Sequence, residues 1–139
     1  MKKILTILLS IVCLSFFLSS CSLLDKAFPK ANPIRYPNVE DITELTIFNS
    51  NNKSKINIID ETDIDKIINN ISNSEPTRNK SVNDQPYVGH YYFISIKANN
   101  ENYYYYLYKE NGKTYIEKPY VGIYRVNNDF LTYIEGLFN

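Results

Sequence analysis

Three stretches rich in tyrosine and isoleucine, separated by turn signals, constrain the fold of this chain more than any other feature. They are YYFISIKA at 91–98, YYYYLY at 103–108 and KTYIEK at 113–118. The dipeptide Asn111-Gly112 is a strong signal for a two-residue hairpin turn, and NNEN at 99–102 predicts a four-residue loop. The sequence therefore predicts three consecutive antiparallel strands over 91–118.

The turns also predict the pairing register of these strands. Residues whose numbers sum to 201 are expected to pair across the first hairpin, and residues summing to 223 across the second. One face of the sheet then carries five core positions: Ile94, Ile96, Tyr105, Leu107 and Ile116. The other face carries an aromatic set that is a candidate binding face: Phe93, Tyr104, Tyr106, Tyr108 and Tyr115.

A further hairpin and two helices complete the predicted domain. ITELTIFN at 42–49 and SKINIID at 54–60 alternate, which places Ile47 opposite Ile56 and Leu45 opposite Ile58. The next segment changes period, because isoleucines fall at helical spacing at 64, 67, 68 and 71. Thr62 with Asp65 resembles a capping box. A last helix fits NNDFLTYIEGLF, with Asn128 as its cap.

Together these elements predict an α+β fold in the order ββα-βββ-α. It consists of an antiparallel sheet of about five strands with two helices packed on its aliphatic face. Residues 39–139 are long enough for one such domain with a modest core. The polar connection NSEPTRNKSVNDQPYVG at 73–89 is long for a domain of this size, and long loops are often functional.

The N-terminus predicts export and lipidation. Lys2 and Lys3 precede an apolar run and two small serines, which is the layout of a secretory signal over residues 1–20. Leu18-Ser19-Ser20-Cys21 resembles the lipobox of bacterial lipoproteins, in which Cys21 receives a diacylglycerol that anchors the chain to the outer face of the cell membrane. The alternative is an ordinary secreted protein with a chance cysteine at the cleavage site.

The segment after the cleavage site predicts an extended tether over residues 21–38. Its prolines at 29, 33 and 37 oppose both helix formation and strand pairing. Cys13 leaves with the signal peptide, so the mature chain keeps one cysteine and no internal disulfide is expected. Two acyl chains on Cys21 would suffice for stable membrane attachment.

Composition limits both the source and the partners. Asn, Lys, Ile, Tyr and Phe make up 68 of 139 residues (18, 12, 18, 13 and 7), which is typical of a low-GC genome such as that of many Gram-positive bacteria. Loss of Lys2 and Lys3 leaves 13 basic and 15 acidic residues, a net charge of −2. No nucleic-acid partner is expected from this balance.

The sequence provides little support for catalysis. His90 is the one histidine, so no second histidine or cysteine could complete a metal site or a nucleophilic dyad. Four glycines leave no phosphate-binding loop. We therefore expect no enzyme activity, no metal and no cofactor.

Tyrosine abundance has two interpretations. Residues 101–124 hold eight of the thirteen tyrosines. On the open face of a sheet, a tyrosine ring shields the backbone ladder while its hydroxyl stays in water, and this structural role is common. The alternative is a recognition surface for a protein or glycan, because tyrosine offers a large contact area at low entropic cost.

One six-residue motif occurs twice in the chain. PYVGHY at 86–91 and PYVGIY at 119–124 differ at one position. NKSVNDQPY, an isoleucine-rich strand and GKTYIEKPYVGIYRV together resemble a family of small Gram-positive lipoproteins of unknown function, over most of 42–138. The specific matches are Ser81, Asp84, Pro86, Tyr115, Ile116, Glu117, Pro119, Tyr120, Gly122, Ile123 and Tyr124.

The resemblance implies that two separate segments belong together. It implies contact between the loop around Asp84-Gln85-Pro86 and the EKPYVGIY segment, and it transfers no catalytic residue. The candidate motif loop comprises Asp84, Pro86, Glu117, Pro119, Tyr120 and Gly122. The alternative is that both segments are structural turns in which Asp84 caps backbone N–H groups.

The functional expectation is a monomeric, non-catalytic binding module on the cell surface. Its expected partners are the membrane, through a lipid on Cys21, and an envelope protein or glycan. One alternative is an immunity lipoprotein against a bacteriocin or contact toxin. Another is an envelope hydrolase or an inhibitor of one.

Overall fold

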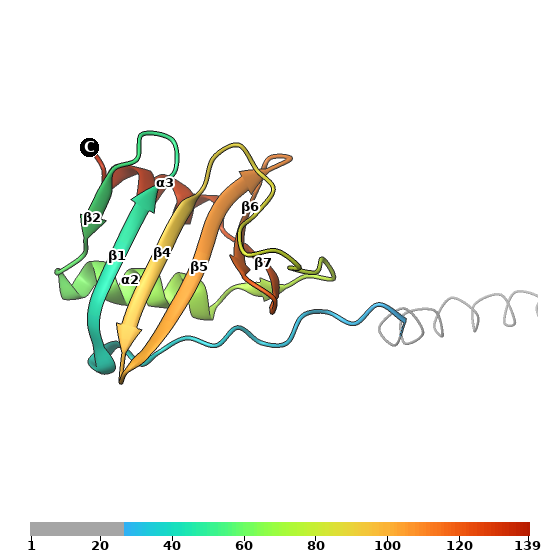
Figure 1. The fold of residues 1–139 in the computed structure, drawn as a ribbon, viewed down its shortest axis with the longest axis horizontal. Coiled ribbons are helices and arrows are strands. Elements are labelled where there is room, and N and C mark those ends of the chain that lie inside the picture. The colour runs from blue at the N-terminus through green and yellow to red at the C-terminus, as the bar shows by residue number, and fades with distance from the viewer. Residues whose placement is uncertain (1–26) are drawn as a thin grey trace, which may run out of the picture. The chain divides into compact units, whose positions relative to one another are not determined.

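A seven-stranded antiparallel sheet with two helices behind it forms the fold in the computed structural model, which describes residues 27–139 (Figure 1). Ala31–Asn139 form one compact unit. The predictions for the signal peptide and Cys21 lie outside the described residues. Among the helices that are described, none has the length and apolar character needed to cross a membrane.

The strands are ordered β2-β1-β4-β5-β6-β7-β3 across the sheet. A 3-10 turn, η1 (Val39–Asp41), precedes the first strand. The elements that follow in chain order are β1 (Ile42–Asn49), β2 (Lys55–Asn57), α2 (Glu61–Ser72), β3 (Glu75–Pro76), β4 (Tyr92–Ala98), β5 (Glu101–Glu110), β6 (Lys113–Lys118), β7 (Gly122–Val126) and α3 (Asn128–Gly136).

The predicted count of about five strands and the order ββα-βββ-α are wrong, although the α+β class holds. The two additional strands are β3 and β7, which pair with each other far apart in sequence, with Glu75 opposite Arg125. An ion pair of 2.6 Å between these two side chains accompanies the pairing. Strand β3 has two residues and no alternation, so only its long-range partner defines it.

One of the two registers predicted for residues 91–118 is correct. The pairs of β5 and β6 sum to 223, as in Leu107 with Ile116. The pairs of β4 and β5 sum to 199 instead of 201, as in Ile94 with Tyr105. The chain turns on Asn99 and Asn100 alone, both at positive φ (47° and 64°), as a type I′ turn requires. A shift of two residues leaves every side chain on its predicted face.

The hairpin of β1 and β2 forms as predicted, but the cap residues of both helices differ from the predicted ones. Ile47 pairs with Ile56, and the Ile58 N–H donates to the Leu45 carbonyl at 2.9 Å just beyond the end of β2. Asp60, rather than Thr62, caps α2 by accepting from the N–H groups of residues 62 and 63. Asn127, rather than Asn128, caps α3.

The core lies between the sheet and the two helices. Helix α2 contributes Ile67, Ile68 and Ile71, and α3 contributes Phe130, Leu131 and Ile134. These pack on the aliphatic face of the sheet, which includes the fully buried side chains of Leu45, Ile47, Ile94, Ile96, Tyr105, Leu107, Ile116 and Tyr124. Both helices therefore bury one face of the sheet and leave the other open.

Residues 31–38, predicted to be part of the tether, are docked on the folded unit. Ile34 joins the core, the Tyr105 hydroxyl donates to the Arg35 carbonyl at 2.6 Å, and the Tyr124 hydroxyl donates to the Asn32 carbonyl at 2.7 Å. Buried phenol groups need acceptors, and an extended segment with free carbonyls provides them. The folded unit thus begins at Ala31, eight residues before the expected boundary at 39.

Candidate functional site

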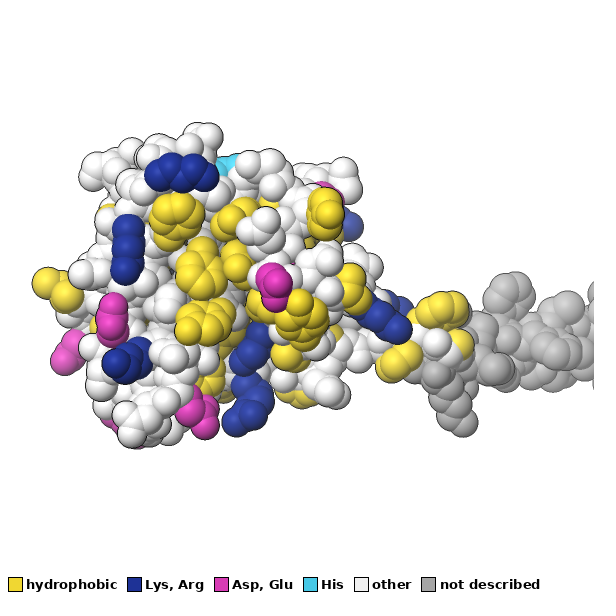
Figure 2. All heavy atoms as spheres, viewed as in Figure 1, with side chains coloured by type: hydrophobic (Ala, Val, Ile, Leu, Met, Phe, Trp, Pro, Cys, Tyr) yellow, Lys and Arg dark blue, Asp and Glu magenta, His cyan; other side chains and the backbone are white. Residues whose placement is uncertain are grey.

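A cluster of aromatic rings lies on the face of the sheet that the helices leave open. We define the aromatic surface as Tyr91, Phe93, Tyr104 and Tyr106. The Phe93 ring lies 5.0 Å from that of Tyr106 and is stacked at 5.7 Å on that of Tyr104, and Tyr91 meets Tyr106 edge-on at 5.2 Å. Figure 2 shows hydrophobic side chains gathered over this face, with lysines and acidic residues around them.

The predicted aromatic face divides into an accessible and a buried part. Tyr104 is 44% exposed, and Phe93 and Tyr106 are half-buried beside it. The Tyr108 ring lies 5.9 Å from that of Tyr115, but Tyr108 is only 4% exposed. Three of the five predicted rings therefore form one surface, and Tyr108 belongs to the interior.

A buried carboxylate is the hydrogen-bond partner of the Tyr108 hydroxyl. Glu117 is 5% exposed, and its two oxygens accept hydrogen bonds from the Ser81 hydroxyl (2.6 Å) and the Tyr108 hydroxyl (3.2 Å). Such bonds offset the cost of removing a charged group from water. Burial, followed by the charge of Glu117, raises the pKa of Tyr108. The network joins the connection between α2 and β4, residues 73–91, to β5 and β6.

The turn between β6 and β7 contains an unusual backbone conformation. The Val121 N–H donates to the Lys118 carbonyl at 3.0 Å, with Pro119 and Tyr120 at the central positions. Tyr120 has φ = 61°, where a type II turn normally carries glycine or asparagine. A residue other than glycine in this region costs about 1–3 kcal/mol and persists only where its surroundings hold it.

Two hydrogen bonds from the 73–91 connection hold Tyr120. Its N–H donates to the Ser81 hydroxyl oxygen at 3.2 Å, and its own hydroxyl donates to the Asp84 carboxylate at 2.7 Å. The hydrogen bond to Asp84 raises the pKa of Tyr120. The structure thus brings Asp84 and the EKPYVGIY segment together, the arrangement that the family resemblance implies.

A cleft opens beside this contact, which we call the motif-loop cleft. It measures about 570 Å³ and is lined by two rings, two side-chain amides, a carboxylate and a proline: Tyr87, Tyr120, Asn83, Gln85, Asp84 and Pro86. Tyr87 is 93% exposed and Tyr120 is 66% exposed. Large rings beside hydrogen-bonding groups are the usual composition of a recognition site.

Tyr91 connects this cleft to the aromatic surface. Its hydroxyl donates to the Gln85 side-chain oxygen at 3.2 Å, while its ring packs on Tyr106. Tyr87 and Tyr91 were not identified from the sequence, although both lie in the PYVGHY echo. The repeated motif could have pointed to them. Their role follows from contacts in the structure, because Tyr87 lines the cleft and Tyr91 packs on Tyr106.

The remaining predicted residues have structural roles. Pro86 is buried, and Pro119 occupies the first central position of the turn. At Gly122, a Cβ would overlap the Cβ of Ala31, so glycine permits the docking of residues 31–38. His90 shares a hydrogen bond of 3.0 Å with the Asn49 side chain and contacts Tyr92 edge-on at 4.9 Å. Within residues 27–139, no cluster of His, Cys, Asp or Glu could hold a metal ion.

Comparison with known families now places the chain. The family model DUF5301, described as "Domain of unknown function (DUF5300)", matches residues 30–125. The chain belongs to the DUF5301 family. The DUF5301 match starts one residue before the compact unit and includes both the motif-loop cleft and the Tyr120 turn. Of the expected resemblance, the match shows the coarser part: the chain belongs to a domain family without known function.

A solved structure shares the DUF5301 fold. It is described as "NMR structure of the protein from Ruminococcus gnavus", is 32% identical, and aligns with a TM-score of 0.60 over 70% of this chain and 94% of that one. No curated protein matches this chain.

Proposed function

We propose that this protein is a non-catalytic binding module held at the outer face of a bacterial membrane by a lipid on Cys21. Its binding site would comprise the aromatic surface and the motif-loop cleft, and its partner would be an envelope protein or glycan. The N-terminal sequence supports the anchor, and the geometry of the open face of the sheet supports the binding role.

The observation that carries the binding role is the conformation and exposure of Tyr120. Glycine would fit this turn without strain, yet a large aromatic residue occupies it with 66% of its surface exposed. Strained residues concentrate at functional sites, where a side chain must be presented in a fixed direction. Tyr87, which lines the motif-loop cleft with Tyr120, and Tyr104, on the aromatic surface, add two further exposed rings. Exposed apolar surface is typical of interaction sites.

The polar groups of the cleft support recognition rather than proton transfer. Asp84 accepts a hydrogen bond from the Tyr120 hydroxyl, and Gln85 accepts one from the Tyr91 hydroxyl, so each is positioned by an aromatic partner. Groups fixed in this way provide direction for a ligand's hydrogen bonds. The rings would supply most of the contact area.

Site-specific crosslinking tests the binding role. A photoreactive phenylalanine analogue replaces Tyr104 or Tyr87 in the full-length lipidated protein on intact cells. A matched control carries it at Tyr36, which is 45% exposed, close to the 44% of Tyr104, and lies in the 31–38 segment. We expect the same envelope partner to be captured from both test positions and not from the control. Equal capture from all three positions, or from none, would contradict the proposal.

The variant Tyr120→Gly separates binding from folding. It removes the ring and the strain of a side chain at positive φ. The melting temperature should therefore stay unchanged or rise, while capture of the partner by the photoreactive residue at position 104 falls. A large drop in melting temperature with capture retained would show that the Tyr120 ring serves the fold alone.

The anchor is tested independently. Cys21→Ala should release the protein into the medium, whereas the native protein stays with the membrane fraction. Continued membrane association of this variant would remove the lipid from the proposal and leave the binding site unaffected.

A further inference from the structure

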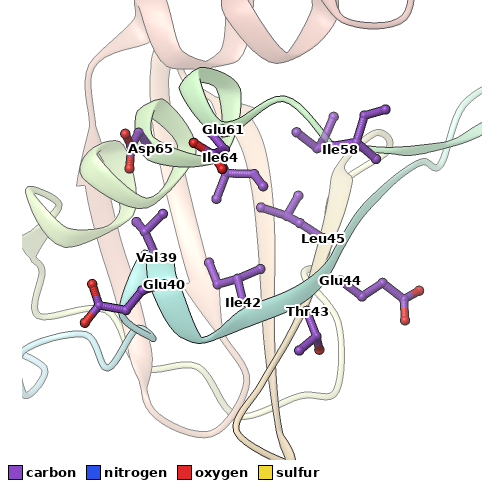
Figure 3. Close-up of a pocket in the computed structure, with 11 residues that line it drawn as sticks. Val39, Glu40, Ile42, Thr43, Glu44, Leu45, Ile58, Glu61, Ile64 and Asp65 are labelled. Atoms are coloured by element: carbon purple, nitrogen blue, oxygen red, sulfur yellow. The ribbon is translucent and has the colours of Figure 1, made fainter.

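A second cleft lies between β1 and the start of α2, and we call it the β1–α2 cleft. It measures about 640 Å³. Its floor is apolar and consists of Val39, Ile42, Leu45, Ile58 and Ile64. Figure 3 shows Ile42, Leu45 and Ile64 in the space between β1 and α2, while Glu40 and Glu44 extend outward at its ends.

The short length of β2 creates this cleft. Strand β2 pairs only with Thr46–Phe48 of β1. Before Thr46, the outer edge of β1 has no strand neighbour within the described chain, and the Ile58 N–H bond to Leu45 marks the point where the chain leaves toward α2. An unpaired strand edge beside an apolar floor is a template that an extended peptide can join.

The mouth of the cleft carries an exposed apolar residue. Ile59 is 89% exposed and lines the cleft next to Ile58, which is 8% exposed. Val39, Ile42 and Ile64 of the floor are half-buried, so the floor is partly accessible. A bound apolar side chain would contact Ile59 as well as these residues.

The rim is strongly acidic. Glu40, Glu44, Glu61 and Asp65 line the cleft, all exposed. Residues 40–65 contain seven acidic residues (40, 41, 44, 60, 61, 63 and 65) and two lysines (53 and 55), a net charge of −5. None of the four rim acids forms an ion pair with another described residue. Glu44 does not pair with Lys97 either, although Lys97 is its neighbour across the ladder.

We infer that the β1–α2 cleft binds a short cationic amphipathic peptide segment in extended conformation along the free edge of β1. Apolar side chains of the peptide would enter the floor, and its lysines or arginines would lie against the rim carboxylates. Complementary charge favours this partner and speeds its encounter with the cleft. Alternation of the two residue types matches the two-residue period of a strand.

The same features disfavour other occupants. A second copy of this chain would bring two acidic rims together, and an anionic polymer would be repelled in the same way. The inference rests on a different surface from the proposed function, so either can fail without the other.

Fluorescence anisotropy tests the inference with the full chain as isolated from cells, placed in nanodiscs of neutral lipid if it carries the lipid. The probe is a labelled short peptide in which leucine and lysine alternate, and empty nanodiscs provide the blank. A matched peptide has glutamate in place of lysine. We expect binding of the lysine peptide alone, and weaker binding as salt is raised above about 0.15 M.

Two variants locate the binding. The double variant Glu44→Gln, Asp65→Asn should weaken it roughly tenfold through loss of complementary charge, and Ile59→Ser should weaken it through loss of apolar contact. The control Glu110→Gln, Glu135→Gln removes two exposed carboxylates elsewhere and should bind as the native protein does. Tyr104→Ala should also leave peptide binding unchanged.

Three outcomes would overturn the inference. One is equal binding of the lysine and glutamate peptides. Another is unchanged affinity in both the rim and Ile59 variants. The third is self-association of the protein that depends on Ile59, which would assign the cleft to a second copy of the chain.

Discussion

Tyr104 and Tyr105 are neighbours in sequence, yet they lie on opposite faces of the sheet and serve different purposes. Tyr105 is fully buried against the helices, and its hydroxyl donates to the Arg35 carbonyl. Tyr104 is 44% exposed and stacks on Phe93. The helix face uses tyrosine as a core residue with one polar bond, whereas the open face uses it as accessible surface.

The two faces are also covered by different segments. Residues 31–38 close part of the helix face through the hydroxyls of Tyr105 and Tyr124. The 73–91 connection closes part of the open face through Ser81 and the buried Glu117. The abundance of one residue type therefore indicates no single role, because its position relative to these covers decides what each ring does.

The largest expected difference in stability is between alanine substitutions of the two neighbouring tyrosines. Tyr105→Ala should lower the free energy of unfolding by about 3–5 kcal/mol, because it leaves a large cavity in the core. Tyr104→Ala should change it by no more than about 0.5 kcal/mol. Chemical denaturation of both variants gives the two values. Similar losses at both positions would remove the distinction between the faces.

Gly122→Ala tests the cover of the helix face. The new methyl group would overlap Ala31, so we expect a loss of about 1–3 kcal/mol. Hydrogen exchange should also show faster exchange of the Ala31 N–H, which donates to the Thr77 carbonyl at 2.9 Å. Gly89→Ala is the control, since no atom lies within 4 Å of the added Cβ. Equal stability of the two variants would mean that residues 31–38 do not need this close approach.

Tyr108→Phe tests the cover of the open face. It removes one of the two hydroxyl donors to the buried Glu117, which should cost about 1–2 kcal/mol. Tyr115→Phe is the matched control, at the position paired with Tyr108 across the ladder. Thermal unfolding of both variants provides the comparison, and an equal effect of the two substitutions would count against the Glu117 network.

The smallest expected effect is the loss of stability at alkaline pH that comes from the buried Tyr105. Burial raises the pKa of Tyr105 in the folded state above its ordinary value of 10.0, so the unfolded chain ionises first. The contribution of Tyr105 to the free energy of unfolding is fully present below pH 10 and is lost as pH rises above it. At about pH 11 this one group should cost about 1.4 kcal/mol. Tyr105→Phe should reduce the difference in unfolding free energy between pH 8 and pH 11 by about that amount, and an unchanged difference would contradict the assignment.

Local pattern was sufficient for the elements whose partners are near in sequence. The Asn111-Gly112 turn specifies a register that the structure reproduces, and the isoleucine spacing over 64–71 specifies α2. The 201 register failed because NNEN allows two loop lengths that differ by two residues, and both place Ile94 on the same face. Alternation alone could not distinguish them.

The missed features depend on contacts between distant residues. Strand β3 exists because β7 pairs with it, and residues 31–38 are ordered because Tyr105 and Tyr124 need acceptors. The candidate site has the same origin, since Asp84 and Tyr120 are far apart in the chain and meet at 2.7 Å. The resemblance implied that contact, but neither the cleft beside it nor the strained backbone at Tyr120 follows from local pattern.

By itself, the sequence determined which residues alternate, which follow a helical period and therefore which tyrosines share a face. Those properties depend on residues two to four positions apart, and turn chemistry fixes them locally. The tertiary structure alone decided which segment covers each face, and so which rings remain accessible to a partner. That choice depends on buried hydroxyls and carboxylates finding partners from remote parts of the chain.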